Sequence, residues 1–183
     1  MKLLNEQNIV EAISNDQWMM KVIRQVATLG LPDWWICAGF IRAKVWDEQH
    51  GFSEKTILPD VDVIYFDSEN PDEYIEKFYE KELMKLDPTI PWSVKNQARM
   101  HTLNKAEPYR SSMDGMSKFP ETATALGVTL NLKGELQLCA PFGVQDLVEM
   151  KIRPTPYFEG SPIYIKRVEQ KNWSATWPLV RVE

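Results

Sequence analysis

The sequence lacks the hallmarks of several protein classes. It has two cysteines, Cys37 and Cys139, which lie in apolar, strand-like runs without the spacing of a metal or redox site, so we expect small core residues. The longest apolar stretch, Trp34 to Ile41, is far too short to cross a bilayer. The N-terminus has neither the apolar segment nor the small-residue cleavage site of a signal peptide. We therefore expect a cytoplasmic protein with no membrane partner.

The chain also has fewer basic than acidic residues. The chain has 21 Lys and Arg against 26 Asp and Glu, a net charge of −5, which argues against general nucleic-acid binding. Residues 51–90 hold eleven acidic and four basic side chains, whereas residues 151–183 hold six basic and three acidic ones. Solvated faces are the simpler interpretation. The alternative is an acidic, metal-binding half that faces a basic, phosphate-binding tail.

What the chain does contain is typical of one globular domain. Its 183 residues are 44% apolar and 11% aromatic, enough to form a core without disulfides or a structural metal. No internal repeat, low-complexity tract or linker interrupts it. We expect a single domain over 1–183, with an N-terminal helical segment (1–30), a core (31–150) and a C-terminal extension (151–183).

Helical and strand patterns alternate along the chain, which predicts an α/β (α+β) fold with a mixed β-sheet flanked by helices. Apolar periodicity predicts helices at 8–14, 16–29, 41–48, 71–86, 143–150 and 162–171. Asn70 and Ser161, each followed by Pro, are expected to cap two of them. Strands are expected at 34–38, 60–66, 92–100, 127–132 and 135–140, the last two forming a hairpin.

Asp60 and Asp62 carry the strongest functional signal. Residues i and i+2 of a strand share one face, roughly 6.6 Å apart, so both carboxylates can reach one cation. Mg²⁺ (or Mn²⁺) suits such a pair, because Mg²⁺ is typically held by one or two carboxylates and completes its shell with water and phosphates. The alternative is two aspartates that merely begin a strand after Pro59. We predict that the pair binds metal and takes part in catalysis.

Gly39 lies where the preceding strand gives way to a helix. The start of a helix presents free backbone N–H groups and a positive dipole end, and glycine lets a phosphate approach closely. Arg42, one turn into this helix, could pair with phosphate oxygens. Lys95 could do so from the 92–100 segment, or simply face water. A tight turn without a ligand is the simpler alternative at Gly39.

Together these features resemble the DNA polymerase β-type nucleotidyltransferase superfamily, whose signature is a strand, a glycine turn into a helix, and a strand with Asp-x-Asp or Asp-x-Glu. Further segments are similar to one small bacterial family of nucleotidyltransferase-like proteins; they are residues 38–42, 45–47, 60–67, 92–101, 119–124, 140–147 and 153–156. The resemblance covers nearly the whole chain from about Trp34.

The resemblance implies a polymerase β-type core preceded by N-terminal helices. It also implies Mg²⁺-dependent transfer of a nucleoside monophosphate from an NTP to a hydroxyl group of an unidentified small molecule or protein. Asp60 and Asp62 would hold the metal. The nucleotide would be bound by Gly39, Phe40, Arg42 and Lys95.

Two departures from the superfamily pattern concern catalysis. Phe40 replaces the Ser or Gly that normally follows the turn glycine, so a phosphate ligand is missing. The third carboxylate that normally helps to activate the attacking hydroxyl has no acidic counterpart; its candidate positions hold Lys95, Asn96, Gln97 or Gln137. Loop residues Glu121, Asp67 or Asp114 could substitute for it. The alternative function is therefore a catalytically degenerate fold that binds a nucleotide or a partner protein.

Overall fold

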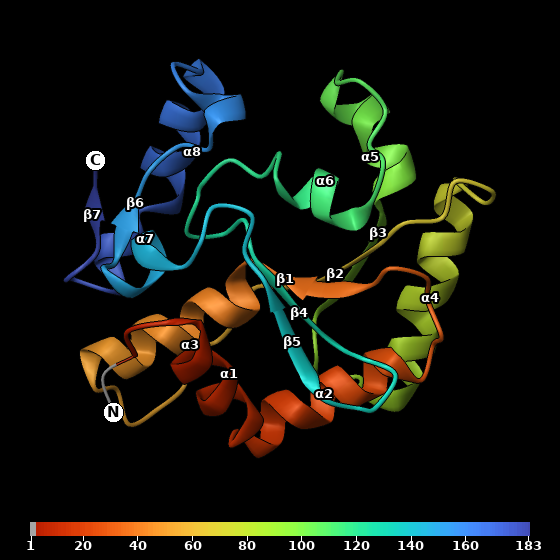
Figure 1. The fold of residues 1–183 in the computed structure, drawn as a ribbon, viewed down its shortest axis with the longest axis horizontal. Coiled ribbons are helices and arrows are strands. Elements are labelled where there is room, and N and C mark those ends of the chain that lie inside the picture. Colours follow the sequence, from red (N-terminus) through yellow and green to blue (C-terminus); the bar gives the residue numbers. More distant parts are fainter. Residues whose placement is uncertain (1–2) are drawn as a thin grey trace.

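A computed structural model describes residues 3–183, so residues 1 and 2 of the predicted N-terminal helical segment lie outside the described residues. Figure 1 shows its helices, which are α1 (Glu6–Ser14), α2 (Gln17–Ala27), α3 (Gly39–His50), α4 (Glu73–Leu86), α5 (Gln97–Asn104), α6 (Ser112–Met116), α7 (Gln145–Val148) and α8 (Pro162–Lys171), with short 3-10 turns at Pro156–Phe158 and Trp173–Ala175. Within the described residues, no helix combines the length and the apolar character needed to cross a membrane.

The centre of the fold is a mixed five-stranded sheet in the order β3-β2-β1-β4-β5. Its strands are β1 (Trp35–Cys37), β2 (Val61–Tyr65), β3 (Trp92–Asn96), β4 (Gly127–Leu130) and β5 (Leu136–Cys139). Only β2 and β3 run parallel, and the other neighbouring pairs are antiparallel. The predicted fold class is thereby confirmed, and the expected hairpin is the β4–β5 pair.

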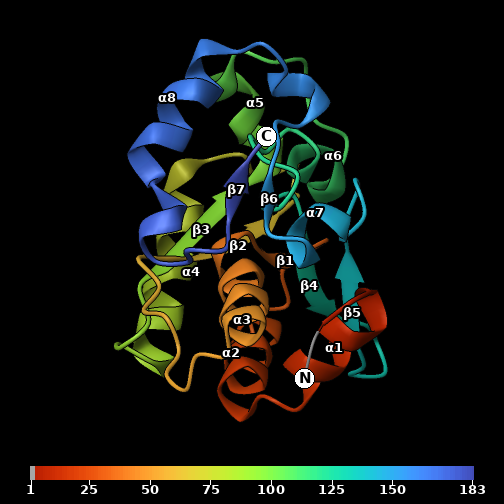
Figure 2. The ribbon, with the colours of Figure 1, turned by 90° about the vertical axis from the view of Figure 1, so that its left-hand side faces the viewer.

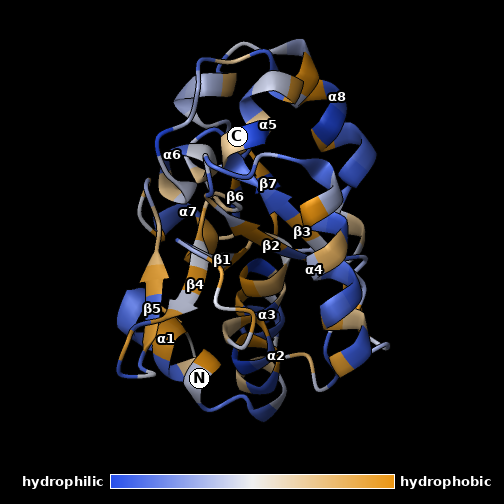
Figure 3. Cartoon of the chain, turned by 90° about the vertical axis from the view of Figure 1, so that its right-hand side faces the viewer, coloured by the Kyte–Doolittle hydropathy of each residue, from blue (hydrophilic) through white to orange (hydrophobic). Residues whose placement is uncertain are grey.

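Helices lie on both sides of this sheet. Figures 1 and 2 show α1, α2 and α3 on one side, and α5, α6 and α8 on the other. The main core fills the side of α2 and α3, where Ile23, Ile41 and Trp46 are fully buried. In Figure 3 the central strands are mostly hydrophobic, whereas α8 carries both hydrophilic and hydrophobic residues. The helix α8 contributes Tyr164 to the core, and Val168 packs against it.

The C-terminal segment folds back onto the body through a second, small sheet. Strand β6 (Lys151–Ile152) pairs in parallel with β7 (Arg181–Val182), a pairing that no sequence pattern predicts. The chain between them forms α8 and then returns to α3, where the Trp177 indole N–H donates to Asp47 at 2.8 Å. The residues of the C-terminal segment are therefore brought against the helix that follows β1.

Two local predictions were wrong. The strand expected over 92–100 ends at Asn96, and α5 begins at Gln97, because the Asn96 side chain accepts a hydrogen bond from the Ala98 N–H at 3.0 Å and caps the helix. Helix α4 is capped by Asp72 instead of Asn70, since Asp72 accepts from the Tyr74 N–H at 2.8 Å. In both places a short-range side-chain cap overrides the apparent pattern.

Candidate active site

Asp60 and Asp62 lie where β2 starts, at the end of the sheet where β1 stops. Asp62 is opposite Cys37 of β1 in the antiparallel pair and opposite Ser93 of β3 in the parallel pair. Val61 between the two aspartates is 1% exposed and belongs to the core. Because strand side chains alternate, both carboxylates belong to the opposite face of the sheet from Val61. The structure thus places them together beside the start of α3.

The surroundings of the Asp62 carboxyl group disfavour its ionised form. Burial, and next the negative charge of Asp60, raise the pKa of Asp62 to about 6. A hydrogen bond from Ser93 and the positive charges of Lys171 and Arg167 oppose this increase in the pKa. The opposing cations show that the end of α8 lies within electrostatic reach of the aspartates. A cation bound between the carboxylates would relieve the same repulsion.

The turn from β1 into α3 is unusual at Ala38. This residue has φ 52° and ψ −115°, a conformation that L-residues rarely adopt. Its N–H donates to Leu126 at 3.1 Å, and its carbonyl accepts from the N–H of Arg42 at 3.0 Å. No side chain caps the first N–H groups of α3. We predicted a turn made by Gly39, but the rare backbone conformation belongs to Ala38, and such strain is concentrated at functional sites.

Gly39 and Phe40 contribute different things to this turn. A methyl group added at Gly39 would meet only the Arg42 Nη2, at 3.6 Å, so the backbone there is open on that side. The Phe40 side chain is 2% exposed and packs against Trp18 with ring centroids 5.7 Å apart. The predicted nucleotide contact of Phe40 is therefore limited to its backbone N–H, since its ring lies in the core.

Arg42 is surrounded by tryptophan rings. Its guanidinium lies over Trp46, Trp173 and Trp177, at 5.3, 5.3 and 5.6 Å from the ring centroids. Its Nε atom is buried and has no hydrogen-bond partner within the described part of the chain. Such cation–π contacts hold a guanidinium in place without using its N–H donors. The rings hold the Arg42 side chain in place and leave its N–H groups available as donors.

The charge of Arg42 is coupled to the acidic groups nearby. Burial lowers the pKa of Arg42 to about 10, opposed first by the negative charge of Glu121. Arg167 lowers this pKa further, whereas Asp60 and Asp62 raise it. Arg42 thus remains a cation at neutral pH. The same couplings show that α3, the aspartate pair and α8 share one electrostatic environment.

Lys95 is engaged elsewhere. Its ammonium lies 3.6 Å from the Glu76 carboxylate, which also accepts two hydrogen bonds from Arg99, at 2.8 and 3.0 Å. Glu76 also accepts a hydrogen bond from the backbone N–H of Asn96, which ends the edge strand β3. Among the described residues no hydrogen bond or ion pair joins Lys95 to Arg42 or to the aspartate pair. Lys95 is thus paired with Glu76, and its contact with a nucleotide stays a prediction.

A third carboxylate does not join the pair. Across residues 3–183, no group of three or more His, Cys, Asp or Glu side chains is placed to hold a metal ion. Glu121 is fully buried and binds Arg167 Nε at 2.5 Å and the Thr124 hydroxyl at 2.7 Å. The other two proposed substitutes accept local hydrogen bonds, Asp67 from Glu69 and Asn70, and Asp114 from Arg110.

The Glu121–Arg167 pair is the main feature that sequence reasoning missed. In the sequence, Glu121 is a possible substitute for the third carboxylate, and Arg167 is one of the six basic residues of 151–183. The two residues are 46 positions apart, so no local spacing predicts their pairing. The structure explains the pairing, because Glu121 is fully buried and a buried carboxylate needs a partner.

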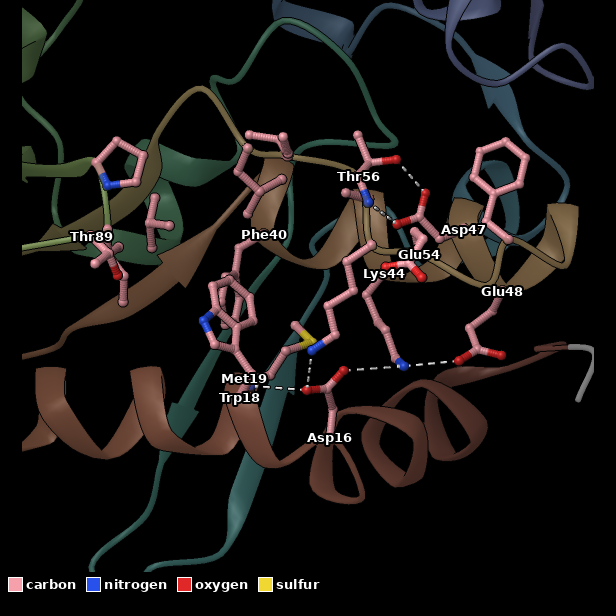
Figure 4. A pocket seen from close by; sticks show the side chains of 18 of the residues that line it. Asp16, Trp18, Met19, Phe40, Lys44, Asp47, Glu48, Glu54, Thr56 and Thr89 are labelled. Carbon is pink, nitrogen blue, oxygen red and sulfur yellow. Dashed lines mark hydrogen bonds and ion pairs between the residues drawn. The ribbon is translucent and has the colours of Figure 1, made fainter. Parts of the chain in front are cut away.

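A separate cavity of about 560 Å³ lies on the other face of the sheet, between α2, α3 and residues 52–58. Figure 4 shows that its ionic groups bind one another: Asp16 accepts from Lys55 at 2.8 Å and pairs with Lys44 at 3.3 Å. Its lining includes Val61 but neither Asp60 nor Asp62. The cavity and the aspartate pair are thus distinct, and only the pair combines clustered like charges with nearby cations that have unused donors.

Comparison with protein families shows the family of the chain. A family model described as nucleotidyltransferase matches residues 24–182. The chain belongs to this nucleotidyltransferase family. The match spans β1, the strained turn, the aspartate pair and the C-terminal segment as far as β7. A comparison with curated proteins gave no match.

Solved structures place this nucleotidyltransferase in a wider fold group. An NMR structure described as a CCA-adding enzyme head domain is 34% identical, with 98% of this chain and 96% of that chain covered and a TM-score of 0.88. The Thermotoga maritima CCA-adding enzyme with tRNA is 15% identical (TM-score 0.58), and a CCA-adding enzyme with CTP is 13% identical (TM-score 0.60). These two matches cover 98% and 100% of this chain.

The same two matches cover 42% and 44% of the CCA-adding enzymes, so the chain spans less than half of their length. At such identities the likeness shows the fold alone. Family membership and the head-domain fold support a general role in nucleotidyl transfer.

Proposed function

We propose that this chain binds an NTP together with Mg²⁺ and transfers its nucleoside monophosphate to a hydroxyl group of a small molecule or protein. The observation that carries the proposal is the position of Asp60 and Asp62, two carboxylates on one face beside the uncapped start of α3. The net charge of −5 does not favour a polyanionic acceptor such as a nucleic acid. A cytoplasmic location is part of the same proposal.

The aspartate pair fits a hard divalent cation. Carboxylate oxygens are the ligands that Mg²⁺ and Mn²⁺ prefer. Burial, and after it the negative charge of Asp60, raise the pKa of Asp62, and the repulsion between the two carboxylates falls when a cation binds. When bound, the ion would neutralise phosphate charge and help to orient the nucleotide. Asp60 and Asp62 are the residues that would hold it.

The remaining residues bind and orient the nucleotide. The first N–H groups of α3, at Gly39 and Phe40, have no acceptor within the helix and can donate to phosphate oxygens. Arg42 adds a fixed positive charge next to this turn. In the transfer, the acceptor oxygen bonds to the α-phosphorus, the bond to pyrophosphate breaks, and pyrophosphate leaves with that electron pair. The hydroxyl proton passes to solvent water.

A second function has one observation in its favour. Among the described residues no third carboxylate joins Asp60 and Asp62, so the chain provides no evident base for the acceptor hydroxyl. A fold that binds a nucleotide without turning it over would need only the pair and the start of α3. Release of pyrophosphate separates the two functions, because binding alone leaves the NTP intact.

The test combines calorimetry of NTP binding with an assay of pyrophosphate release. Wild type should bind an NTP in Mg²⁺ and not in EDTA, and both Asp60→Asn and Asp62→Asn should abolish the Mg²⁺-dependent part. Asp72→Asn is the matched control: it makes the same change of charge at an exposed helix cap, where Asn caps as well as Asp. Unaltered binding by the two site variants, with circular dichroism unchanged, would refute the proposal.

A further inference from the structure

Helix α8 turns one face toward the aspartate pair. Tyr164, Arg167 and Lys171 recur at intervals of three and four residues, so they share one face of the helix. Tyr164 is 8% exposed and packs against the body, while Arg167 and Lys171 continue the same face toward the C-terminal end of the helix. The two cations therefore share the helix face of Tyr164, with Arg167 half-buried and Lys171 exposed at the C-terminal end of α8.

Arg167 is held in a fixed position. Its Nε donates to Glu121 Oε1 at 2.5 Å and its Nη2 to Oε2 at 3.5 Å, and Glu121 is itself fixed by Thr124. A guanidinium has five N–H donors, so this pairing leaves Nη1 and part of Nη2 unused. Glu121 is thus a positioning residue that orients Arg167 and leaves donors available for an anion.

The backbone places Glu121 at the same end of the sheet as Asp62. Cys37 lies opposite Asp62 on one side and opposite Gly127 on the other. Ala38, which follows β1, donates its N–H to the carbonyl of Leu126. Leu126 comes directly after a turn in which the Ala125 N–H donates to the Glu121 carbonyl at 3.0 Å. Arg167, bound to Glu121, therefore lies at the mouth of the site.

Lys171 is tied to the same region through the tryptophan cluster. Trp173, two residues after Lys171, packs under the Arg42 guanidinium, 5.3 Å from its ring centroid. Arg42 in turn lies beside Gly39 at the start of α3. Lys171 and Arg167 also lie within electrostatic reach of Asp62.

The three cations share side-chain donors that bind no protein group. Within residues 3–183 neither the Arg42 nor the Lys171 side chain makes a hydrogen bond or an ion pair, and Arg167 retains an unpaired Nη1. A guanidinium with a buried, unpaired Nε costs free energy unless an anion offsets it. The cations also balance the charges of three carboxylates, Asp60, Asp62 and Glu121. One divalent cation added to this balanced set leaves an excess of two positive charges.

We propose that Arg42, Arg167 and Lys171 form a polyphosphate-binding site that takes the β- and γ-phosphates of the NTP. The inference rests on the proposed function and adds the residues that grip the leaving pyrophosphate. It explains how the fold can dispense with a hydroxyl after the turn glycine, where Phe40 stands: the C-terminal segment supplies the phosphate contacts that the turn lacks.

The test is a calorimetric titration of the full chain with inorganic tripolyphosphate, in Mg²⁺ and near-physiological salt. Lys171→Gln should weaken tripolyphosphate binding on the order of tenfold, because one charge-assisted contact to phosphate is lost. The matched control is Lys166→Gln, an exposed lysine on the same helix that has no ion pair among the described residues. It should bind within about twofold of wild type.

Arg167 needs a paired substitution, since removing it alone would leave Glu121 buried and unpaired. The double variant Glu121→Gln/Arg167→Gln removes both charges and should also weaken tripolyphosphate binding about tenfold, with circular dichroism unchanged. Binding of NTP should weaken in parallel.

Two outcomes overturn the inference. If wild type and all variants bind tripolyphosphate equally, the cations of α8 are not the site; Mg²⁺-dependent NTP binding that is lost in Asp62→Asn would then still support the proposed function. If wild type does not bind tripolyphosphate, the polyphosphate site is refuted, and the NTP titration judges the proposed function separately.

Discussion

Replacing Asp62 by Asn should stabilise the metal-free protein at neutral pH. Burial and the charge of Asp60 raise the pKa of Asp62 from 3.8 to about 6. This difference corresponds to about 3 kcal/mol by which folding disfavours the charged form. Asn keeps the size of the side chain and can still accept from Ser93, but carries no charge. Because Arg167 and Lys171 lose an attractive partner, we expect a gain of about 1–3 kcal/mol.

The sign of the pH dependence follows from the raised pKa. The folded protein holds the Asp62 proton more tightly than the unfolded chain does. Its contribution to stability is therefore complete below about pH 4 and is lost as the pH rises through about 6. The advantage of Asp62→Asn should accordingly be full at pH 7.5 and should fall toward zero as the pH approaches 4.

Urea denaturation in EDTA at pH 7.5 and pH 4.5, followed by circular dichroism, measures this difference. Asp72→Asn is the control for the change of net charge and should show no comparable gain. Addition of Mg²⁺ should stabilise wild type and not Asp62→Asn, so the two proteins should converge. A loss of stability in Asp62→Asn at pH 7.5, or an equal gain at both pH values, would refute the reasoning about this site.

The remaining predictions concern the metal, turnover, the strained turn and a helix cap. Mn²⁺ should broaden NMR signals near Gly39 in wild type and in neither Asp60→Asn nor Asp62→Asn; equal broadening in all three would remove the metal from the site. Without a specific acceptor, the common NTPs should bind but release little pyrophosphate, and brisk release would show that an unrecognised base completes the site. Ala38→Gly should raise the melting temperature, by up to about 1 kcal/mol of stability, because glycine tolerates φ 52°; a lower melting temperature would show that no strain is stored there. Burial would raise the pKa of Asp16, but hydrogen bonds from Lys55 and the Met19 N–H hold it below 3.8. Asp16→Ala should therefore destabilise the protein by about 1–2 kcal/mol at pH 7, and this loss should shrink as the pH falls below 4; a loss that is independent of pH would contradict that account.

The parts of the fold that depend on local patterns could be predicted from the sequence. The apolar runs of β1 and β2, the glycine between β1 and α3, and the cap of α8 at Ser161 are each encoded within a few residues. The alternation across 92–100 was misleading, because its second half belongs to a helix. Asn96 sets that boundary by capping α5 at the Ala98 N–H. Its side chain is held there by bonds far away in the chain, since it accepts from the Asp67 N–H and donates to the Asn70 carbonyl.

In the candidate site, too, the features set by local sequence could be predicted and those set by long-range contacts could not. The positions of Asp60 and Asp62 follow from the period of one strand, so the sequence could indicate them. The rare conformation of Ala38 depends on its hydrogen bond to Leu126, and the orientation of Arg167 depends on Glu121. Neither has a local signature, because each arises only when β4 and α8 pack beside β1 and α3.

The long-range contact between Glu121 and Arg167 also bears on the absence of a third carboxylate among the described residues. Glu121, one of the possible substitutes, forms an ion pair that orients Arg167, so at this end of the sheet cations balance carboxylates. Such a balance favours binding of a metal-polyphosphate group and departure of pyrophosphate, since both depend on positive charge. It does not favour removal of a proton from an acceptor. If the chain transfers a nucleoside monophosphate as proposed, the acceptor itself or a partner that provides the base must then supply most of the reactivity of the acceptor hydroxyl.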